Sequence, residues 1–94
     1  MFRILFKPSA IQRLKRMRRF DAVAIVDSIE RHLSGEPERA AKGTIKRLRG
    51  RQETTYRLRV GDYRVFYDVI DDRVEVSQIL HKSETAAFYK KEGP

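Results

Sequence analysis

The fold of this chain is decided by residues 56–80, which read YRLRVGDYRVFYDVIDDRVEVSQIL. Apolar and polar side chains alternate along this stretch with a period of two, which predicts β-strands. The predicted strands are residues 56–60, 63–70 and 73–80. Gly61-Asp62 joins the first two, with glycine at the first central position of a type II′ hairpin turn, and Asp71-Asp72 joins the last two. We therefore expect a three-stranded antiparallel meander.

The two-residue loop at Gly61-Asp62 fixes which side chains share a face of this sheet. Val60 then faces Tyr63, and Arg59 faces Arg64. The predicted apolar face holds Tyr56, Leu58, Val60, Tyr63, Val65, Tyr67, Val74, Val76 and Leu80, with Gln78 as its one polar exception. The predicted basic face holds Arg57, Arg59, Arg64, Phe66, Asp68, Ser77, Ile79 and His81. A slip of one residue would turn the arginines into the core, so the alternation supports this register.

Three arginines gather on the basic face. Arg59 lies directly opposite Arg64, and Arg57 lies two positions along the same face. Like charges directly opposite one another destabilise a sheet, so we interpret the three arginines as a site for an anion. The alternative is a solvated face on which the arginine stems cover apolar surface.

The segments around the meander predict helices and one further strand. Residues 2–6, FRILF, read as a strand. A helix then begins at Pro8-Ser9, with an apolar stripe of Ile11, Leu14 and Met17. A second helix follows Asp21 as its N-cap and ends at Gly35, a C-cap glycine. Its predicted buried face consists of Ala22, Ile25, Val26, Ile29 and Leu33.

Two further segments complete the expected fold. Residues 44–55, TIKRLRGRQETT, are interpreted as connecting structure. Ser83 is predicted to cap a last helix that runs to about Lys91. The resulting order is N-terminal strand, helical hairpin, three-stranded antiparallel meander and C-terminal helix. This is an α+β fold, expected as one domain over residues 1–94.

The amino-acid composition indicates which kind of binding partner and which cellular compartment to expect. The chain has 21 Lys and Arg against 13 Asp and Glu, a net charge of +8. Such a surplus favours a polyanionic partner, because neutralised phosphates release condensed counterions. With no cysteine and two histidines, neither a disulfide, a metal site nor a cofactor is expected. No apolar run is long enough for a membrane span, and charge interrupts the N-terminus too early for a signal peptide, which predicts a cytoplasmic protein.

Residues 46–89 contain an ordered series of features: Leu48-Arg49-Gly50, the strand Tyr56 to Arg59, the turn Gly61 to Arg64, the strand Val65 to Ile70, the turn Asp71-Asp72 and the strand Val74 to Leu80. In this order they resemble the RelE/ParE superfamily of toxins. The helical hairpin of residues 9–34 also matches the layout of that superfamily. The resemblance implies a RelE-like fold and a small toxin that is neutralised by a cognate antitoxin.

In the RelE branch, the resemblance implies an endoribonuclease that cuts mRNA in the ribosomal A site. The cut needs no metal: the ribose 2′-OH attacks the adjacent phosphate, so a base, an acid and cations are required. By this resemblance the catalytic residues are Arg64 and Tyr89, while Arg57 and Arg59 bind phosphate. The other predicted phosphate-binding residues are Arg49, Arg51 and Lys82.

The chain departs from RelE at several of these positions. Arg57 and Arg59 stand where RelE has lysines, and arginine remains protonated, which makes it a poor proton shuttle. The arginine expected near Ser83 is absent, so His81 becomes a third candidate catalytic residue, since histidines titrate near neutral pH. Two alternatives stay open. One is a ParE-like toxin that binds DNA gyrase without nuclease chemistry, and the other is an inactive RNA-binding relative.

Overall fold

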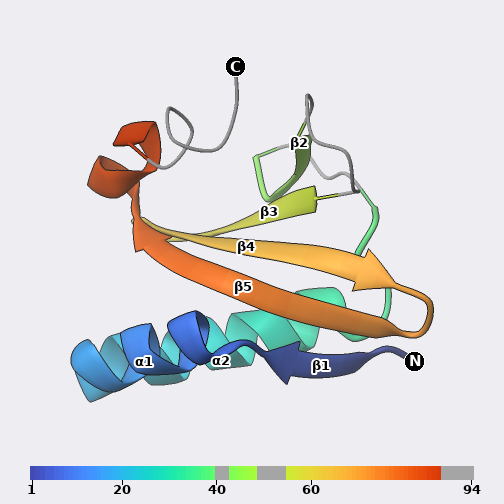
Figure 1. Ribbon diagram of the computed structural model, residues 1–94, viewed down its shortest axis with the longest axis horizontal. Helices are drawn as coiled ribbons and strands as arrows, with labels where there is room; N and C mark the ends of the chain where they lie inside the picture. The colour runs from blue at the N-terminus through green and yellow to red at the C-terminus, as the bar shows by residue number, and fades with distance from the viewer. Residues whose placement is uncertain (40–42, 49–54, 88–94) are drawn as a thin grey trace.

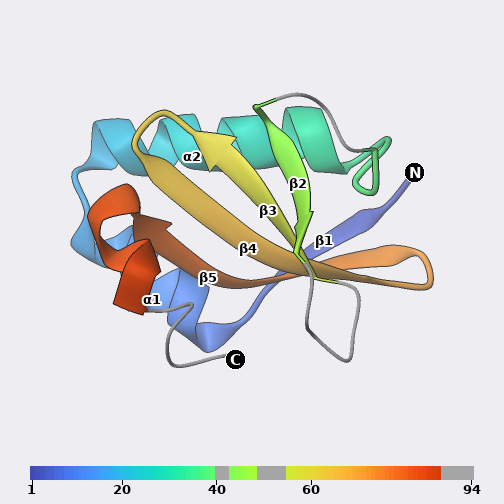
Figure 2. The ribbon, with the colours of Figure 1, turned by 90° about the horizontal axis from the view of Figure 1, so that it is seen from above.

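The computed structural model describes residues 1–39, 43–48 and 55–87, which form a five-stranded sheet with two helices against one face (Figure 1; Figure 2). The elements in chain order are β1 (Arg3–Phe6), α1 (Pro8–Arg16), α2 (Arg19–Leu33), β2 (Ile45–Leu48), β3 (Thr55–Val60), β4 (Tyr63–Ile70), β5 (Arg73–His81) and the 3₁₀ helix η1 (Lys82–Glu84). The strand order is β1-β5-β4-β3-β2, with β1 parallel to β5 and the other pairs antiparallel. The α+β fold is confirmed.

The β3–β4 hairpin has the register that the sequence predicts. Val60 pairs with Tyr63, Arg59 with Arg64 and Leu58 with Val65. Gly61 has a φ of +56°, whereas Asp62 has no positive φ, as expected when glycine occupies the first central position of a type II′ turn. At the next turn Asp71 has a φ of +54°, a left-handed conformation that aspartate tolerates better than most residues.

The predicted register of β5 is wrong beyond Val76. A β-bulge shifts the pairing between Phe66 and Tyr67, so that Tyr67 pairs with Val76 but Phe66 pairs with Gln78. One extra residue on β5 reverses the faces of everything that follows it. Ile79 is therefore fully buried in the core, and His81 lies on the same face. The bulge turns Gln78 and Leu80 to the face that carries Arg59 and Arg64, which removes the polar exception from the apolar face.

Residues 45–48 form β2, an edge strand that the sequence reading assigned to connecting structure. Ile45 pairs with Leu58 and is buried, whereas Lys46 pairs with Arg57 and is exposed. Four residues with a single buried side chain are too short to display a period of two, which explains the wrong prediction. Residues 49–54 of the same predicted connection lie outside the described residues.

Both helices pack their apolar stripes on the core face of the sheet. In α1 the buried residue is Ala10, with Leu14 and Met17 partly buried, while Ile11 is 40% exposed and so stands apart from the predicted stripe. The helix α2 begins at Arg19, with Arg18 as its N-cap, so the prediction of Asp21 as N-cap is wrong. Asp21 instead lies in the first turn, where its negative charge interacts favourably with the positive end of the helix dipole.

The C-terminal end of α2 also differs in detail from the predicted cap. Ser34 is the C-cap, and its hydroxyl donates to the Glu30 carbonyl at 2.6 Å. Gly35 follows Ser34 directly, but its φ is not positive, so it does not adopt the left-handed conformation of a C-cap glycine.

The hydrophobic core lies between the helices and the sheet. Its fully buried members include Ile29 and Leu33 of α2 and Leu58, Val65 and Val74 of the strands. Burying each such side chain contributes roughly 1.5–3 kcal/mol. The phenol of Tyr67 is also buried, and it donates to the carbonyl oxygen of Pro37 at 2.6 Å, which anchors the chain after α2 to the middle of the sheet.

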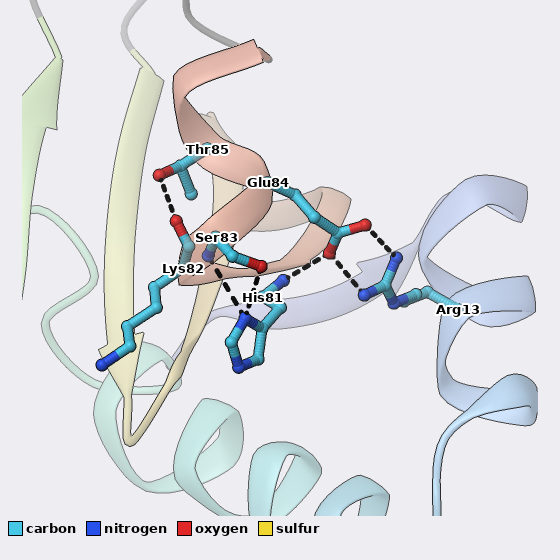
Figure 3. Close-up of polar contacts among 6 residues, drawn as sticks. All are labelled: Arg13, His81, Lys82, Ser83, Glu84 and Thr85. Carbon is cyan, nitrogen blue, oxygen red and sulfur yellow. Dashed lines mark hydrogen bonds and ion pairs between the residues drawn. The ribbon is translucent and has the colours of Figure 1, made fainter.

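A helical segment follows β5 on the opposite side of the sheet from α2 (Figure 1). It consists of η1 and the helical residues 85–87. Its cap is His81 rather than the predicted Ser83: the His81 ring accepts the Ser83 backbone N–H, and Glu84 accepts the His81 backbone N–H (Figure 3). The remainder of the predicted helix, residues 88–91, lies outside the described residues. Neither helix in the described chain is long and apolar enough to cross a membrane.

Candidate phosphate-binding face

The sheet face opposite the helices carries the two facing arginines. Arg59 and Arg64 are cross-strand partners near the β3–β4 turn. The Arg59 backbone N–H donates to the Thr44 carbonyl at 2.8 Å, so it points away from β4. Arg59 and Arg64 therefore form a pair without backbone hydrogen bonds between them, the kind in which cross-strand side chains approach most closely. The register therefore places the two arginine side chains at directly opposite positions on one face.

Arg57 and Lys46 extend the positive charge across β3 to the edge strand. They are direct cross-strand partners, so both project from the face that carries Arg59 and Arg64. The buried Nε–H of Arg57 has no hydrogen-bond acceptor among the described residues. A buried cationic donor without an acceptor is costly, and an anion on this face would supply one. Lys46 was missed from the sequence because β2 was not recognised as a strand.

Arg64 is held over the hairpin turn. Its Nη1 donates to the carbonyl oxygens of Gly61 and Tyr63, both at 3.0 Å. These contacts orient the guanidinium at the β3–β4 turn, at the end of the face.

Lys82 lies at the same hairpin turn as Arg64. Its backbone N–H donates to the Asp62 carbonyl at 2.7 Å, and its Nζ is 3.4 Å from the Asp62 carboxylate. The structure thus brings Lys82 near Arg64 through a shared turn, but part of its charge is compensated by Asp62. The remaining predicted residues, Arg49, Arg51 and Tyr89, lie outside the described residues.

His81 lies on the helix-covered face, which the sheet separates from the facing arginines. Its ring contacts Tyr63 edge to face, with centroids 5.5 Å apart. Together with Arg18, Asp21 and Ile25, these rings line a hollow of about 430 Å³. The prediction that His81 joins the basic face is therefore wrong, and the cause is the bulge in β5.

The hydrogen bonds of His81 orient its ring. Nδ1 accepts the Ser83 backbone N–H at 3.2 Å and lies 2.9 Å from Ser83 Oγ (Figure 3). A ring nitrogen that accepts a hydrogen bond has no proton, so this contact corresponds to the neutral tautomer with its proton on Nε2.

Comparison with solved structures defines the class of fold. The chain is similar to a chain of the RelB-RelE antitoxin-toxin complex from Methanococcus jannaschii, with 23% identity and a TM-score of 0.63 over 90% of this chain and 98% of that one. It is also similar to a chain of the toxin-antitoxin complex RelBE2 from Mycobacterium tuberculosis, with 25% identity and a TM-score of 0.66 over 85% and 96%. The YoeB dimer from Staphylococcus aureus gives 24% identity and a TM-score of 0.57 over 82% and 92%. The fold is that of RelE-like toxins.

The family follows from the sequence match. A family model described as the ParE toxin of the type II toxin-antitoxin system, parDE, matches residues 4–86. Comparison with curated proteins gave no match. The chain belongs to this ParE toxin family, within the RelE/ParE superfamily of type II toxins.

Proposed function

We propose that this toxin is a ribosome-dependent mRNA endonuclease that inhibits translation in the cytoplasm. The observation that carries the proposal is the pair Arg59–Arg64, two arginines directly opposite one another on the sheet face away from α1 and α2. A structural role would not require this repulsion. A phosphate between the two guanidinium groups would convert the repulsion into two attractions, each with bidentate hydrogen-bonding geometry available.

The chemistry proposed is attack of a ribose 2′-OH on the adjacent phosphate, which forms a 2′,3′-cyclic phosphate as the bond to the 5′-oxygen of the next nucleotide breaks; the 2′-OH loses its proton and the departing 5′-oxygen gains one. The arginines stabilise the charge that develops on the phosphate oxygens, which is the role fixed cations perform best. They do not move protons, because arginine stays protonated. We assign proton transfer to Tyr89 on the basis of the family resemblance. We assign none to His81, since it lies on the sheet face that α2 covers, away from the facing arginines.

We further propose a cognate antitoxin as the regulatory partner. The similar structures from Methanococcus jannaschii and Mycobacterium tuberculosis are toxin–antitoxin complexes. The net charge of +8 would favour an acidic antitoxin segment that folds on the toxin surface.

Primer extension on a defined mRNA, with and without programmed ribosomes, tests the nuclease proposal. We expect cuts within A-site codons only when ribosomes are present. Arg64→Gln should reduce the cleavage rate by about 100-fold or more, the magnitude typical of a lost transition-state cation. Arg31→Gln is the matched control, because Arg31 is an exposed arginine of α2 paired with Asp27. Cleavage that survives in Arg64→Gln would remove Arg64 from the catalytic residues.

A second candidate is inhibition of DNA gyrase without nuclease chemistry. The observation in its favour is that the matching family model describes ParE toxins. A gyrase supercoiling assay with the same protein separates the two candidates. Inhibited supercoiling with uncut mRNA would support the gyrase target. Uninhibited supercoiling together with uncut mRNA would identify an inactive relative.

A further inference from the structure

A polar hollow of about 350 Å³ lies between α1 and the second half of β5. β1 pairs with β5 only as far as Val76, and Lys7 then donates its backbone N–H to the Val76 carbonyl at 2.9 Å. Beyond this point α1 replaces β1 at the edge of β5, and the hollow opens between them. Its lining includes Ser9, Gln12, Arg13, Arg16, Gln78 and Leu80.

The β-bulge places two lining residues of this hollow, Gln78 and Leu80, on the phosphate-binding face. Leu80 pairs directly with Arg64 across the strands. The hollow therefore adjoins the strand position next to Arg64.

The two arginines of the hollow differ in whether a carboxylate is paired with them. Arg13 is neutralised by Glu84, to which its guanidinium donates twice. Arg16 makes no ion pair with any described residue, so no carboxylate in that part of the chain compensates its positive charge. Gln12 and Gln78 each bring a carboxamide with both a donor and an acceptor. One free cation beside two carboxamides suits a ligand with an anionic group and a planar hydrogen-bonding edge.

We propose that this hollow binds the nucleotide next to the phosphate held by Arg59 and Arg64, with Arg16 on its own phosphate and Gln12 and Gln78 on the base edge. Glutamine side chains read base edges through paired hydrogen bonds, and single-stranded RNA exposes these edges. The volume is within the range of small-ligand sites. The inference rests on the proposed RNA substrate and adds residues that select the base.

Nitrogen-15 NMR of the full chain tests the hollow directly, without any cleavage. Each nucleoside 5′-monophosphate is titrated in turn, with inorganic phosphate as the reference anion. We expect the side-chain amides of Gln12 and Gln78 to shift with a nucleotide but not with phosphate alone. Arg16→Gln should weaken nucleotide binding by about tenfold, the loss of one charge-assisted contact. Arg31→Gln should leave it unchanged. The variant Gln12→Ala should change the order of preference among the four bases.

The outcomes separate this inference from the nuclease proposal. Nucleotide-specific shifts that are weakened in Arg16→Gln support the hollow, even if the protein cuts no RNA. Equal shifts with phosphate alone, or binding unaffected by both substitutions, overturn it, even if primer extension shows cleavage. Shifts of the two amides with a purified antitoxin but with no nucleotide would also overturn it, since the hollow would then be a protein contact.

Discussion

Arg13 and Glu84 form a two-point ion pair that joins α1 to the segment after β5. The Arg13 guanidinium nitrogens donate to the two carboxylate oxygens of Glu84 at 3.1 and 2.5 Å. The same carboxylate accepts the His81 backbone N–H at 2.8 Å (Figure 3). These hydrogen bonds, with that from Arg13 the strongest, hold the pKa of Glu84 below its ordinary value. Glu84 therefore anchors the start of the C-terminal segment to both α1 and the end of β5.

Replacing Glu84 by Gln should lower the free energy of unfolding by about 1 kcal/mol at pH 7, the upper range for a partly exposed ion pair. Because the pKa of Glu84 is lowered by folding, this stabilisation is present above the ordinary value of 4.5 and is lost as the pH falls through the folded value. The unfolding free energies of the wild type and Glu84→Gln, measured in urea, should thus converge as the pH falls below 4.5 and through the lowered folded value. Glu36→Gln is the control, since Glu36 and its partner Arg39 are both largely exposed. An equal loss in both variants would contradict the prediction.

The hydrogen bond from Tyr67 to Pro37 provides a second test. Tyr67→Phe leaves a buried carbonyl without its donor and should cost about 1–3 kcal/mol of unfolding free energy. Tyr56→Phe, at a buried tyrosine stacked on Tyr67 with centroids 5.6 Å apart, should cost less, because no described residue bonds to the Tyr56 hydroxyl. Thermal or urea denaturation measures both. Similar losses would show that the Pro37 contact contributes little.

Burial also raises the pKa of Tyr67 well above its ordinary value of 10.0. The neutral phenol is favoured by folding, so the associated stability is complete below pH 10 and decreases as the pH rises beyond it. The free energy of unfolding of Tyr67→Phe should depend less on pH between 10 and 12 than that of the wild type. Unchanged alkaline sensitivity would argue against this coupling.

The β5 bulge predicts opposite consequences for two neighbouring residues. Ile79→Ala removes a fully buried side chain and should cost about 2–4 kcal/mol, whereas Leu80→Ala, at a partly exposed position on the other face, should cost less than about 1.5 kcal/mol. Urea denaturation of the two variants measures the difference. The regular alternation expected from the sequence predicts the reverse order, so a larger loss at Leu80 would contradict the bulge.

The facing arginines predict a stabilising effect of anions. Arg59→Gln should raise the free energy of unfolding in low salt by a few tenths of a kcal/mol, because it removes a like-charge pair. Sulfate that binds the folded state should raise the melting temperature of the wild type more than that of Arg59→Gln. Arg31→Gln should respond like the wild type, since its partner Asp27 lies on the same helix. Equal responses in all three proteins would show that the arginines do not form an anion site.

Side-chain patterning within short segments could be interpreted correctly from the sequence. The period of two and the Gly61-Asp62 turn placed Arg59 opposite Arg64, and the structure has this pairing. Both signals are local, because a two-residue hairpin leaves the register of its strands no freedom. The family resemblance is carried by residues of the same hairpin, and the family match over residues 4–86 agrees with it.

The sequence-based predictions were wrong where contacts between distant parts of the chain determine the local structure. Asp21 has the chemistry of an N-cap, yet the extended backbone at Arg18 places the N-cap of α2 three residues earlier. Ile45–Leu48 becomes a strand only because β3 presents a free edge to it, and this adds Lys46 to the cationic face. His81 has the chemistry of a proton-transfer residue, but its position depends on how β5 pairs with β4.

The sequence by itself therefore determined the order of the elements other than β2, the hairpin of β3 and β4, and the two arginines that face each other there. These features follow from contacts between near neighbours in the chain. The tertiary structure alone decided that β5 carries a bulge, with Ile79 in the core, His81 behind the sheet and Gln78 beside the hollow. The physical reason is that Ile79 gains core burial against Val65 only if one extra residue is inserted before it. That gain depends on the packing of helices and strands that are far apart in the sequence, and no local pattern encodes it.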